Sequence, residues 1–361
     1  MSDDLHAELV TLTCDLVRFE STAERPDQLH GVLDYVAAYL ETLPGLFIER
    51  SEANGKPALV VTLREGRTPA LMINGHLDVV MGRPSQFGPE VRDGRIYARG
   101  AQDMKGSCAV MLRLIRDLAA RPDRPDVGFQ FVTDEEIGGR DGTGRLLSEG
   151  WNCEFMLCLE PTDLGILFEH KAAMWVQLDL PGQPAHGSRP WAGHNPITDL
   201  TEGLAALATH YPPLSHEQWR TTITPTQITT APGSRNQVPA GLSVTLDIRH
   251  TLDDTPASLQ ATLAQCFPQA VIAVKAQGPG LYTDPEHPAV DRVANLITRH
   301  TGQPPRFFRE HYATDARYYT NAGVPAICLG PVGAGLHSDE EWVSVDSLLD
   351  LHAILTDYIL S

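Results

Sequence analysis

The sequence predicts an α/β fold that is interrupted by a small α+β unit. At both ends of the chain, short apolar runs that stop at polar residues alternate with helical patterns, which indicates a sheet covered by helices on both faces. Between about residues 172 and 282, apolar and polar residues alternate instead, as they do in strands with one exposed face. We therefore expect one domain formed by residues 1–171 and 283–361, with an inserted domain at 172–282.

The elements of the first segment follow from the spacing of apolar residues. Leucines and valines recur every three or four positions at 5–20 and 27–43, as on the buried face of a helix. In chain order we then expect a strand at 57–63, a strand within 69–80, a helix at 106–120, and strands at 127–133 and 154–160.

The inserted segment has the element order of a ferredoxin-like unit. Alternating strands are expected at 172–182, 221–230 and 240–250, and helices at 196–210 and 256–266. This order indicates a β-α-β-β-α-β unit with one open sheet face. After it we expect a helix at 288–300, a strand at 324–330 and a terminal helix from Val345.

Composition excludes some classes of partner. The 361 residues carry 28 basic and 46 acidic side chains, a formal charge of −18, so the chain offers no basic surface to nucleic acid or to an anionic membrane. The six cysteines form no CxxC pair, which is typical of reduced thiols in a cytosolic protein. The acidic start has no signal-peptide pattern, and no apolar run approaches the roughly 20 residues that span a bilayer. We therefore expect a cytoplasmic protein with neither nucleic acid nor a membrane as partner.

Polar side chains gather where the predicted strands end, which is where open α/β sheets bind ligands. In INGHLDVV, His76 and Asp78 are two residues apart and so face the same side of a strand. A histidine that binds a metal usually donates its other N–H to a carboxylate, and Asp78 suits that task or could orient the histidine indirectly. The alternative is an ordinary surface pair.

Asp103 lies in RGAQDMKGS, between a glycine and a predicted helix. A carboxylate at this place could bridge two cations. The alternative is a helix N-cap, a position that aspartate also favours.

The stretch VGFQFVTDEEIGG ends an apolar run in three adjacent carboxyl groups. In a hydrolase with two metals, one carboxylate binds a metal and another takes a proton from the attacking water, and Glu135 and Glu136 could divide these tasks. The alternative is a solvated acidic turn, although the apolar run directly before it argues against that.

Two further residues complete the set. Glu160 ends an apolar run in CLEPT, and His337 lies in the glycine-rich GAGLHSDEE. Either residue alone is more often structural than a ligand. Together with the others they form a mixed set of oxygen and imidazole donors, which suits zinc, with cobalt or manganese as substitutes.

The motifs GHLDVV, GAQDMKGS, TDEEIGG, CLEPT and GLHSDEEW, in this order, closely resemble those of a family of co-catalytic zinc peptidases and deacylases. That family includes acetylornithine deacetylase, succinyl-diaminopimelate desuccinylase, aminoacylase and carboxypeptidase G. The resemblance covers nearly the whole chain. It implies a zinc-peptidase-like catalytic domain, with a central mixed sheet between helices, interrupted by a ferredoxin-like α+β lid domain.

The resemblance also implies roles for the residues. His76 and Glu160 would hold one Zn²⁺ and Glu136 and His337 the other, with Asp103 bridging the two ions. Glu135 would be the general base, and Asp78 the partner of His76. A non-proline cis peptide is expected at Asp103–Met104.

In the lid, GQPAHGSRP resembles the family segment whose histidine stabilises the oxyanion, which points to His186. Several relatives dimerise through the lid and supply this histidine from the partner subunit, so a homodimer is expected. SRNQVPA and DIRH resemble segments that contact the substrate through Asn236 and Arg249. The alternative for Arg249 is a surface ion pair with Asp247 or Asp253.

The activity implied is hydrolysis of the amide bond of N-acyl amino acids or small peptides that bear a free carboxylate, by a metal-activated water with a glutamate as base. Within the enzymes, the alternative to a deacylase is a dipeptidase or carboxypeptidase. A binding protein that holds metal without catalysis is the alternative from another class.

Overall fold

The structure is a computed structural model, and it describes residues 2–361. The chain divides into two compact units. The first comprises the residues up to Glu169 together with Leu281–Glu310 and Thr314–Ser361, and the second comprises His170–Gly280 with His311–Ala313.

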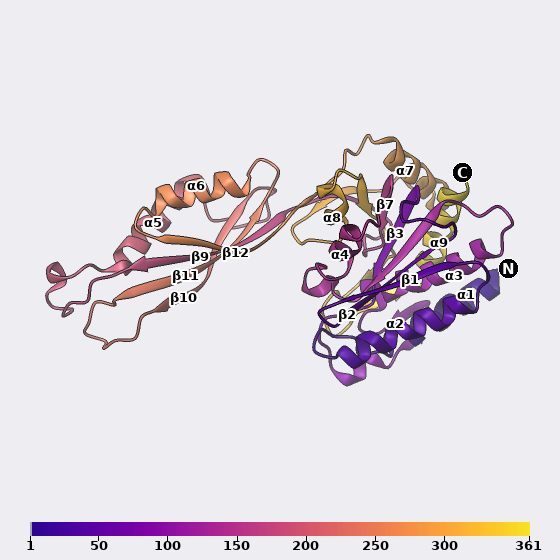
Figure 1. The fold of residues 1–361 in the computed structure, drawn as a ribbon, viewed down its shortest axis with the longest axis horizontal. Coiled ribbons are helices and arrows are strands. Elements are labelled where there is room, and N and C mark those ends of the chain that lie inside the picture. The colour runs from indigo at the N-terminus through magenta and orange to yellow at the C-terminus, as the bar shows by residue number, and fades with distance from the viewer. Residues whose placement is uncertain (1) are drawn as a thin grey trace. The chain divides into compact units, whose positions relative to one another are not determined.

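The first unit is built on a nine-stranded sheet with the order β1-β2-β6-β3-β7-β15-β8-β13, and β14 pairs with β8 (Figure 1). Strands β3, β6, β7 and β15 run parallel to their neighbours within this group, whereas β1, β2 and β8 pair antiparallel. The sheet is therefore mixed, which confirms the predicted fold class. Its strands are β1 (Phe47–Ala53), β2 (Lys56–Thr62), β3 (Leu71–His76), β6 (Val127–Val132), β7 (Phe155–Cys158), β8 (Ile166–His170), β13 (Leu281–Tyr282), β14 (Phe307–Glu310) and β15 (Ala326–Cys328).

Helices cover both faces of this sheet, because its central strands are apolar on both sides. In β3, for example, Ile73 faces one apolar cluster and Met72 the other. The first cluster includes side chains from α1 (Ser2–Val17), α2 (Pro26–Glu41), α3 (Gly106–Ala119), α7 (Pro288–Thr301) and α9 (Val345–Leu360). The second includes side chains from α4 (Thr143–Ser148) and α8 (Ala316–Asn321).

The parallel strands bring their carboxyl ends to one edge of the sheet. His76, the last residue of β3, is in register with Val132, the last residue of β6, and Asn74 of β3 is in register with Cys158, the last residue of β7. Polar residues that follow these strands are therefore neighbours, although they are far apart along the chain.

A smaller four-stranded sheet of the first unit was not predicted, because its strands are only two or three residues long. It has the order β16-β17-β5-β4, and it places the loop that carries His337 between β16 and β17. Its strands are β4 (Glu90–Arg92), β5 (Arg95–Tyr97), β16 (Gly333–Ala334) and β17 (Trp342–Ser344).

The second unit has a four-stranded antiparallel sheet with the order β10-β11-β9-β12. Helices α5 (Pro196–His210) and α6 (Pro256–Cys266) lie on one face of it, as Figure 1 shows. Burial alternates strictly along β11, which matches the predicted open sheet face. The strands are β9 (Ala172–Pro181), β10 (Thr222–Thr230), β11 (Gly241–His250) and β12 (Val271–Gly278), so the chain order is the predicted β-α-β-β-α-β.

The long elements lie within a few residues of their expected positions. The two α-helices of the inserted unit begin at capped positions, since Asn195 caps α5 and Thr255 caps α6 through their side chains. No helix among residues 2–361 combines the length and apolar composition needed to cross a membrane.

Candidate active site

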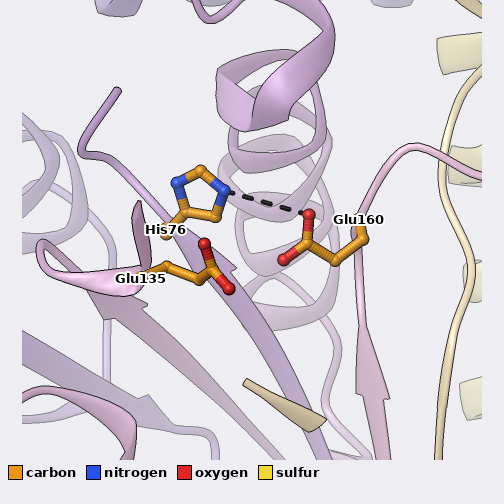
Figure 2. A group of neighbouring side chains, drawn as sticks. All are labelled: His76, Glu135 and Glu160. Carbon is orange, nitrogen blue, oxygen red and sulfur yellow. Dashed lines mark ion pairs between the residues drawn. The ribbon is translucent and has the colours of Figure 1, made fainter. Parts of the chain in front are cut away.

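The predicted site residues of the first unit gather at the carboxyl edge of the large sheet. His76 ends β3, and the short turn Glu135–Ile137 follows β6. Glu160 lies two residues after β7. Figure 2 shows the carboxylate of Glu135 below the His76 ring and that of Glu160 to its right, with a dashed line from the ring to Glu160.

Asp103 lies between two imidazoles. Its Oδ1 atom is 3.0 Å from Nε2 of His76, and its Oδ2 atom is 3.4 Å from Nε2 of His337. Each imidazole has a second carboxylate beside it. Nε2 of His76 is 3.9 Å from Oε2 of Glu160, and Nε2 of His337 is 3.4 Å from Oε2 of Glu136. The five residues thus form two histidine–glutamate pairs that share one aspartate.

Asp103 is not the N-cap of α3, so that alternative is wrong. The helix begins at Gly106, and Asp103 and Met104 have non-helical backbone angles just before it. The peptide bond between Asp103 and Met104 is cis, which confirms the expectation. The irregular turn keeps the Asp103 side chain free of the helix terminus.

Asp78 orients His76 indirectly, through its backbone, which is the second of the two expected arrangements. The carbonyl oxygen of Asp78 lies 2.9 Å from Nδ1 of His76, whereas its carboxylate Oδ1 lies 3.6 Å away. The carboxylate instead accepts the backbone N–H groups of Glu135 and Glu136, at 3.2 and 3.0 Å. One buried residue therefore orients the imidazole through its backbone and the acidic turn through its side chain.

The stretch TDEEIGG is not a solvated turn. Asp134 is buried, and its Oδ2 atom accepts the backbone N–H groups of Asp141 and Gly142. Glu135 and Glu136 are only partly exposed. The three carboxyl groups thus have separate tasks, since Asp134 holds the following loop while the other two point to the histidines.

The site holds more carboxylates than positively charged groups. Hydrogen bonds to Asp103 and Glu136 raise the pKa of His337 to about 10. Burial disfavours a charged His76, but the hydrogen bond to Asp103 and the charge of Glu160 outweigh it and raise the pKa of His76. Burial also raises the pKa of Glu135 and of Glu160. Protons on the imidazoles thus offset crowded carboxylates where a bound cation would do the same.

The donor atoms fit divalent metal ions. Donor atoms of His76, Glu135 and Glu160 lie within 4.8 Å of one another, and so do those of His76, Asp103 and Glu136. His337 is close to both members of the Asp103–Glu136 pair. Imidazole nitrogen and carboxylate oxygen are ligands that zinc accepts, and a carboxylate shared by two histidines suits two neighbouring ions.

In the second unit, His186 and Asn236 lie side by side. Nδ2 of Asn236 is 3.5 Å from Nε2 of His186, residues 186 and 237 form an isolated β-bridge, and both side chains are exposed. The Ser188 hydroxyl lies 2.8 Å from Nδ1 of His186, and the backbone N–H of Ser188 donates to the same nitrogen at 3.1 Å. The two residues predicted to contact the reacting group and the substrate are thus neighbours.

Arg249 lies elsewhere on that unit, near the end of β11. Its guanidinium forms an ion pair with Asp247, with Nε 2.9 Å from Oδ1, so the predicted ion-pair alternative is present in the structure. It also lies over the ring of Trp175, 5.4 Å from the centroid. In the register of β11 with β9, Arg249 pairs with Ala173, whereas Gly241 at the other end of β11 pairs with Pro181.

A layer of residues behind the acidic turn was not predicted from the sequence. Arg317 and Tyr318 both donate to the carbonyl oxygen of Gly138, at 2.7 and 2.6 Å. Gly139 has a positive φ of 62°, and a Cβ atom on it would lie 1.8 Å from Oδ1 of Asp315. The polar run ATDAR was the only hint of this layer in the sequence, because α8 is too short to show a period.

Comparison with known proteins agrees with this geometry. Residues 72–361 match the model of peptidase family M20/M25/M40. A succinyl-diaminopimelate desuccinylase of Xylella fastidiosa (strain M12) is 28% identical over 380 residues, covering 98% of this chain and 99% of the relative.

Solved structures share the fold. The aminopeptidase PepT of Bacillus cereus has a TM-score of 0.79 at 18% identity, covering 98% of both chains. A dinuclear metal-binding peptidase of Bacillus subtilis has a TM-score of 0.71 at 13% identity, covering 99% of this chain and 98% of that one. The chain therefore belongs to peptidase family M20/M25/M40, and it is a metal-dependent amidohydrolase.

Proposed function

We propose that this protein hydrolyses the amide bond of N-acyl amino acids or small peptides that bear a free carboxylate, with two zinc ions as cofactors. Cobalt or manganese would be the substitutes. The observation that carries the proposal is the position of Asp103, whose two carboxylate oxygens face the imidazoles of His76 and His337. A carboxylate shared in this way is suited to bridging two cations.

His76 and Glu160 would hold one ion and Glu136 and His337 the other, with Asp103 between them. The short distances within each histidine–glutamate pair support this division. When bound, the two ions would polarise the scissile carbonyl and acidify a water molecule beside it.

Glu135 is the proposed general base. Its carboxylate lies within 4.8 Å of donor atoms of His76 and Glu160. Its backbone N–H donates to the carboxylate of Asp78 at 3.2 Å, which fixes the start of the acidic turn. Burial raises its pKa, which suits a group that takes a proton from water and passes it to the leaving nitrogen. Because the Glu135 carboxylate is also within reach of an ion bound by His76 and Glu160, a variant that separates ligand from base is needed.

In the second unit, we assign His186 to the oxyanion and Asn236 and Arg249 to the substrate. The contact between His186 and Asn236 supports a common target for these two. Arg249 can present two parallel N–H groups to a substrate carboxylate, as it does now to Asp247.

The positions of these residues support a homodimer through the second unit, which would act as a lid and as the dimerisation domain. His186 pairs beside the start of β11, whereas Arg249 is near the end of that strand. Eight residues of extended strand separate the two ends by roughly 27 Å. This separation supports the proposal that the His186 and the Arg249 that meet one small substrate come from different copies of the chain.

A deacylase and a peptidase differ in the acyl group that they remove from the substrate nitrogen. The relative in sequence is named a desuccinylase and the two structural neighbours are named peptidases, so the comparisons do not separate the two classes. We favour the wider statement, which is amide hydrolysis next to a free carboxylate. The six cysteines all have free thiols, which supports a reducing, cytoplasmic location.

The experiment is a substrate screen with mass detection. The zinc-loaded and cobalt-loaded protein would be incubated with a panel of N-acyl amino acids, dipeptides and tripeptides, each with and without a free carboxylate. We expect cleavage of members with the free carboxylate and none after treatment with a chelator. Tight binding of two ions without cleavage of any member would favour a protein that only binds metal.

A further inference from the structure

Glu341 is a buried carboxylate for which the proposed function has no task. It follows His337 by four residues in the same loop, and only 2% of its surface is exposed. A carboxylate at this depth is costly unless several donors surround it. Its partners therefore show what the residue holds in place.

All four of its donors come from one short segment, the one that carries Asp103. Oε1 of Glu341 accepts the backbone N–H groups of Gln102 and Asp103, at 3.0 and 3.2 Å. Oε2 accepts the backbone N–H of Gly100 at 2.9 Å and Nη1 of Arg99 at 2.7 Å. The carboxylate thus fixes the irregular backbone that delivers Asp103 to the site.

Arg99 extends the same contact to the His337 loop. It is 3% exposed, and its second terminal nitrogen, Nη2, donates to the carbonyl oxygen of Ser338 at 3.0 Å. Ser338 directly follows His337. The Arg99–Glu341 pair therefore joins the segment of Asp103 to the loop of His337 at two points, Ser338 and Glu341.

We propose that Glu341 and Arg99 are positioning residues that set the distance between Asp103 and His337. This proposal rests on the proposed function, in which Asp103 is shared by two ions and His337 holds the second. Neither residue touches the other ligands of the first ion, which reach the site from β3 and β7. The second ion should therefore depend on this pair more strongly than the first.

The substitution Glu341→Gln removes hydrogen-bond acceptors from the four donors without changing the size of the side chain. The amide keeps the shape of the side chain, but its NH₂ group would face two of the four donors, and no proton acceptor would remain there. The Asp103 segment and the His337 loop would then separate or turn. We expect the second step of metal binding to weaken by about tenfold or more, while the first step changes much less.

The test is a stepwise titration of the metal-free protein with Co²⁺, followed by visible absorption of the bound ion. The absorption reports the ligand geometry of each ion, so it responds to positioning and not only to activity. Glu340→Gln is the matched control, because Glu340 is the exposed neighbour in the same loop. Thermal unfolding of each metal-free variant shows whether it is folded.

The expected result is two binding steps in the wild type and in Glu340→Gln, with the second step weakened and its spectrum altered in Glu341→Gln. Two unchanged steps in Glu341→Gln would overturn the proposal. If Glu341→Gln does not fold, Arg99→Lys decides, because lysine keeps the charge but cannot reach Glu341 and Ser338 with two nitrogens; an unchanged second step there overturns the proposal. A wild type that binds fewer than two ions would instead refute the two-metal function itself.

Discussion

The carbonyl oxygen of Asp78, and not its carboxylate, is the atom that contacts the imidazole of His76, at 2.9 Å from Nδ1. This leaves both carboxylate oxygens of Asp78 free to accept the N–H groups of Glu135 and Glu136. The substitution Asp78→Asn should therefore spare the orientation of His76 and disturb the acidic turn, since an amide can accept only one of the two N–H groups.

For Asp78→Asn we expect a loss of turnover of about 10-fold to 100-fold, with the first metal equivalent retained. Metal content by elemental analysis and kcat with the best substrate of the screen would be measured together. Loss of the first metal along with activity would show that the carboxylate, and not the carbonyl, supports His76.

The substitution Glu135→Gln should abolish hydrolysis while leaving zinc content near that of the wild type. A glutamine cannot take the proton from water, and general-base catalysis contributes roughly 10²- to 10⁴-fold. The measurement is kcat beside zinc stoichiometry after gel filtration. If one zinc is lost together with activity, Glu135 is a ligand and the base must be sought elsewhere.

Metal affinity should rise with pH. In the metal-free protein, Asp103 and Glu136 raise the pKa of His337 to about 10, so this imidazole is protonated at neutral pH and must lose its proton when it binds an ion. For each imidazole that loses a proton, affinity should increase by about tenfold per pH unit below its pKa. Competition with a zinc indicator between pH 6.5 and 8.5 measures this slope.

His337→Ala should lower the slope of log affinity against pH by about one, because one proton fewer is released, and it should weaken binding of the second ion. His30→Ala is the control, because His30 is a partly exposed histidine of the same unit that also faces a carboxylate, that of Glu52. A slope that is equal in all three proteins would show that His337 does not bind metal.

Lys105 should make stability depend on pH. Its side chain is fully buried, with Nζ donating to the carbonyl oxygen of Phe19 at 2.8 Å, and burial lowers its pKa to about 7 from an ordinary value of 10.5. Between these two values the unfolded chain binds a proton that the folded chain has lost. The contribution of Lys105 to stability therefore rises with pH in this window, by at most about 1.4 kcal/mol per pH unit, and is smallest below pH 7.

The measurement is denaturant unfolding of the metal-free protein at pH 7 and pH 9. The stability difference between the two pH values should shrink in Lys105→Met. Lys56→Met is the matched control, since Lys56 also donates to a carbonyl oxygen, that of Ala23, but is not fully buried. An equal pH dependence in the wild type and Lys105→Met would contradict the prediction.

His186→Ala should reduce kcat by about 10²- to 10³-fold without changing metal content, as expected for loss of one oxyanion donor. If the histidine acts on the partner subunit, mixing inactive His186→Ala with inactive Glu135→Gln should restore activity. In a random mixture of dimers about one quarter of the sites would then be complete. No recovery after subunit exchange, verified by mass spectrometry of tagged chains, would place His186 at the site of its own chain.

Much of the fold was predictable because long elements have a strong local pattern. The apolar runs before His76, Glu135 and Glu160 became β3, β6 and β7 within a few residues of their expected ends. Short elements were missed, as in the small sheet around β17, because two or three residues cannot show a period. For Asp103, before α3, the sequence was compatible with two roles, a carboxylate that bridges two cations and a helix N-cap, because the local pattern suits both.

The sequence by itself determined which residues end the central strands, and therefore which carboxylates and imidazoles could meet at the edge of a parallel sheet. Spacing along the chain sets this, because the side-chain period and the direction of parallel strands follow from local rules. Only the tertiary structure decided which atom faces which: the two oxygens of Asp103 toward two imidazoles, and the four donors of Arg99–Asp103 around Glu341. Arg99 and Glu341 are 242 residues apart, and a hydrogen bond over that separation depends on the packing of the whole unit and on no local pattern.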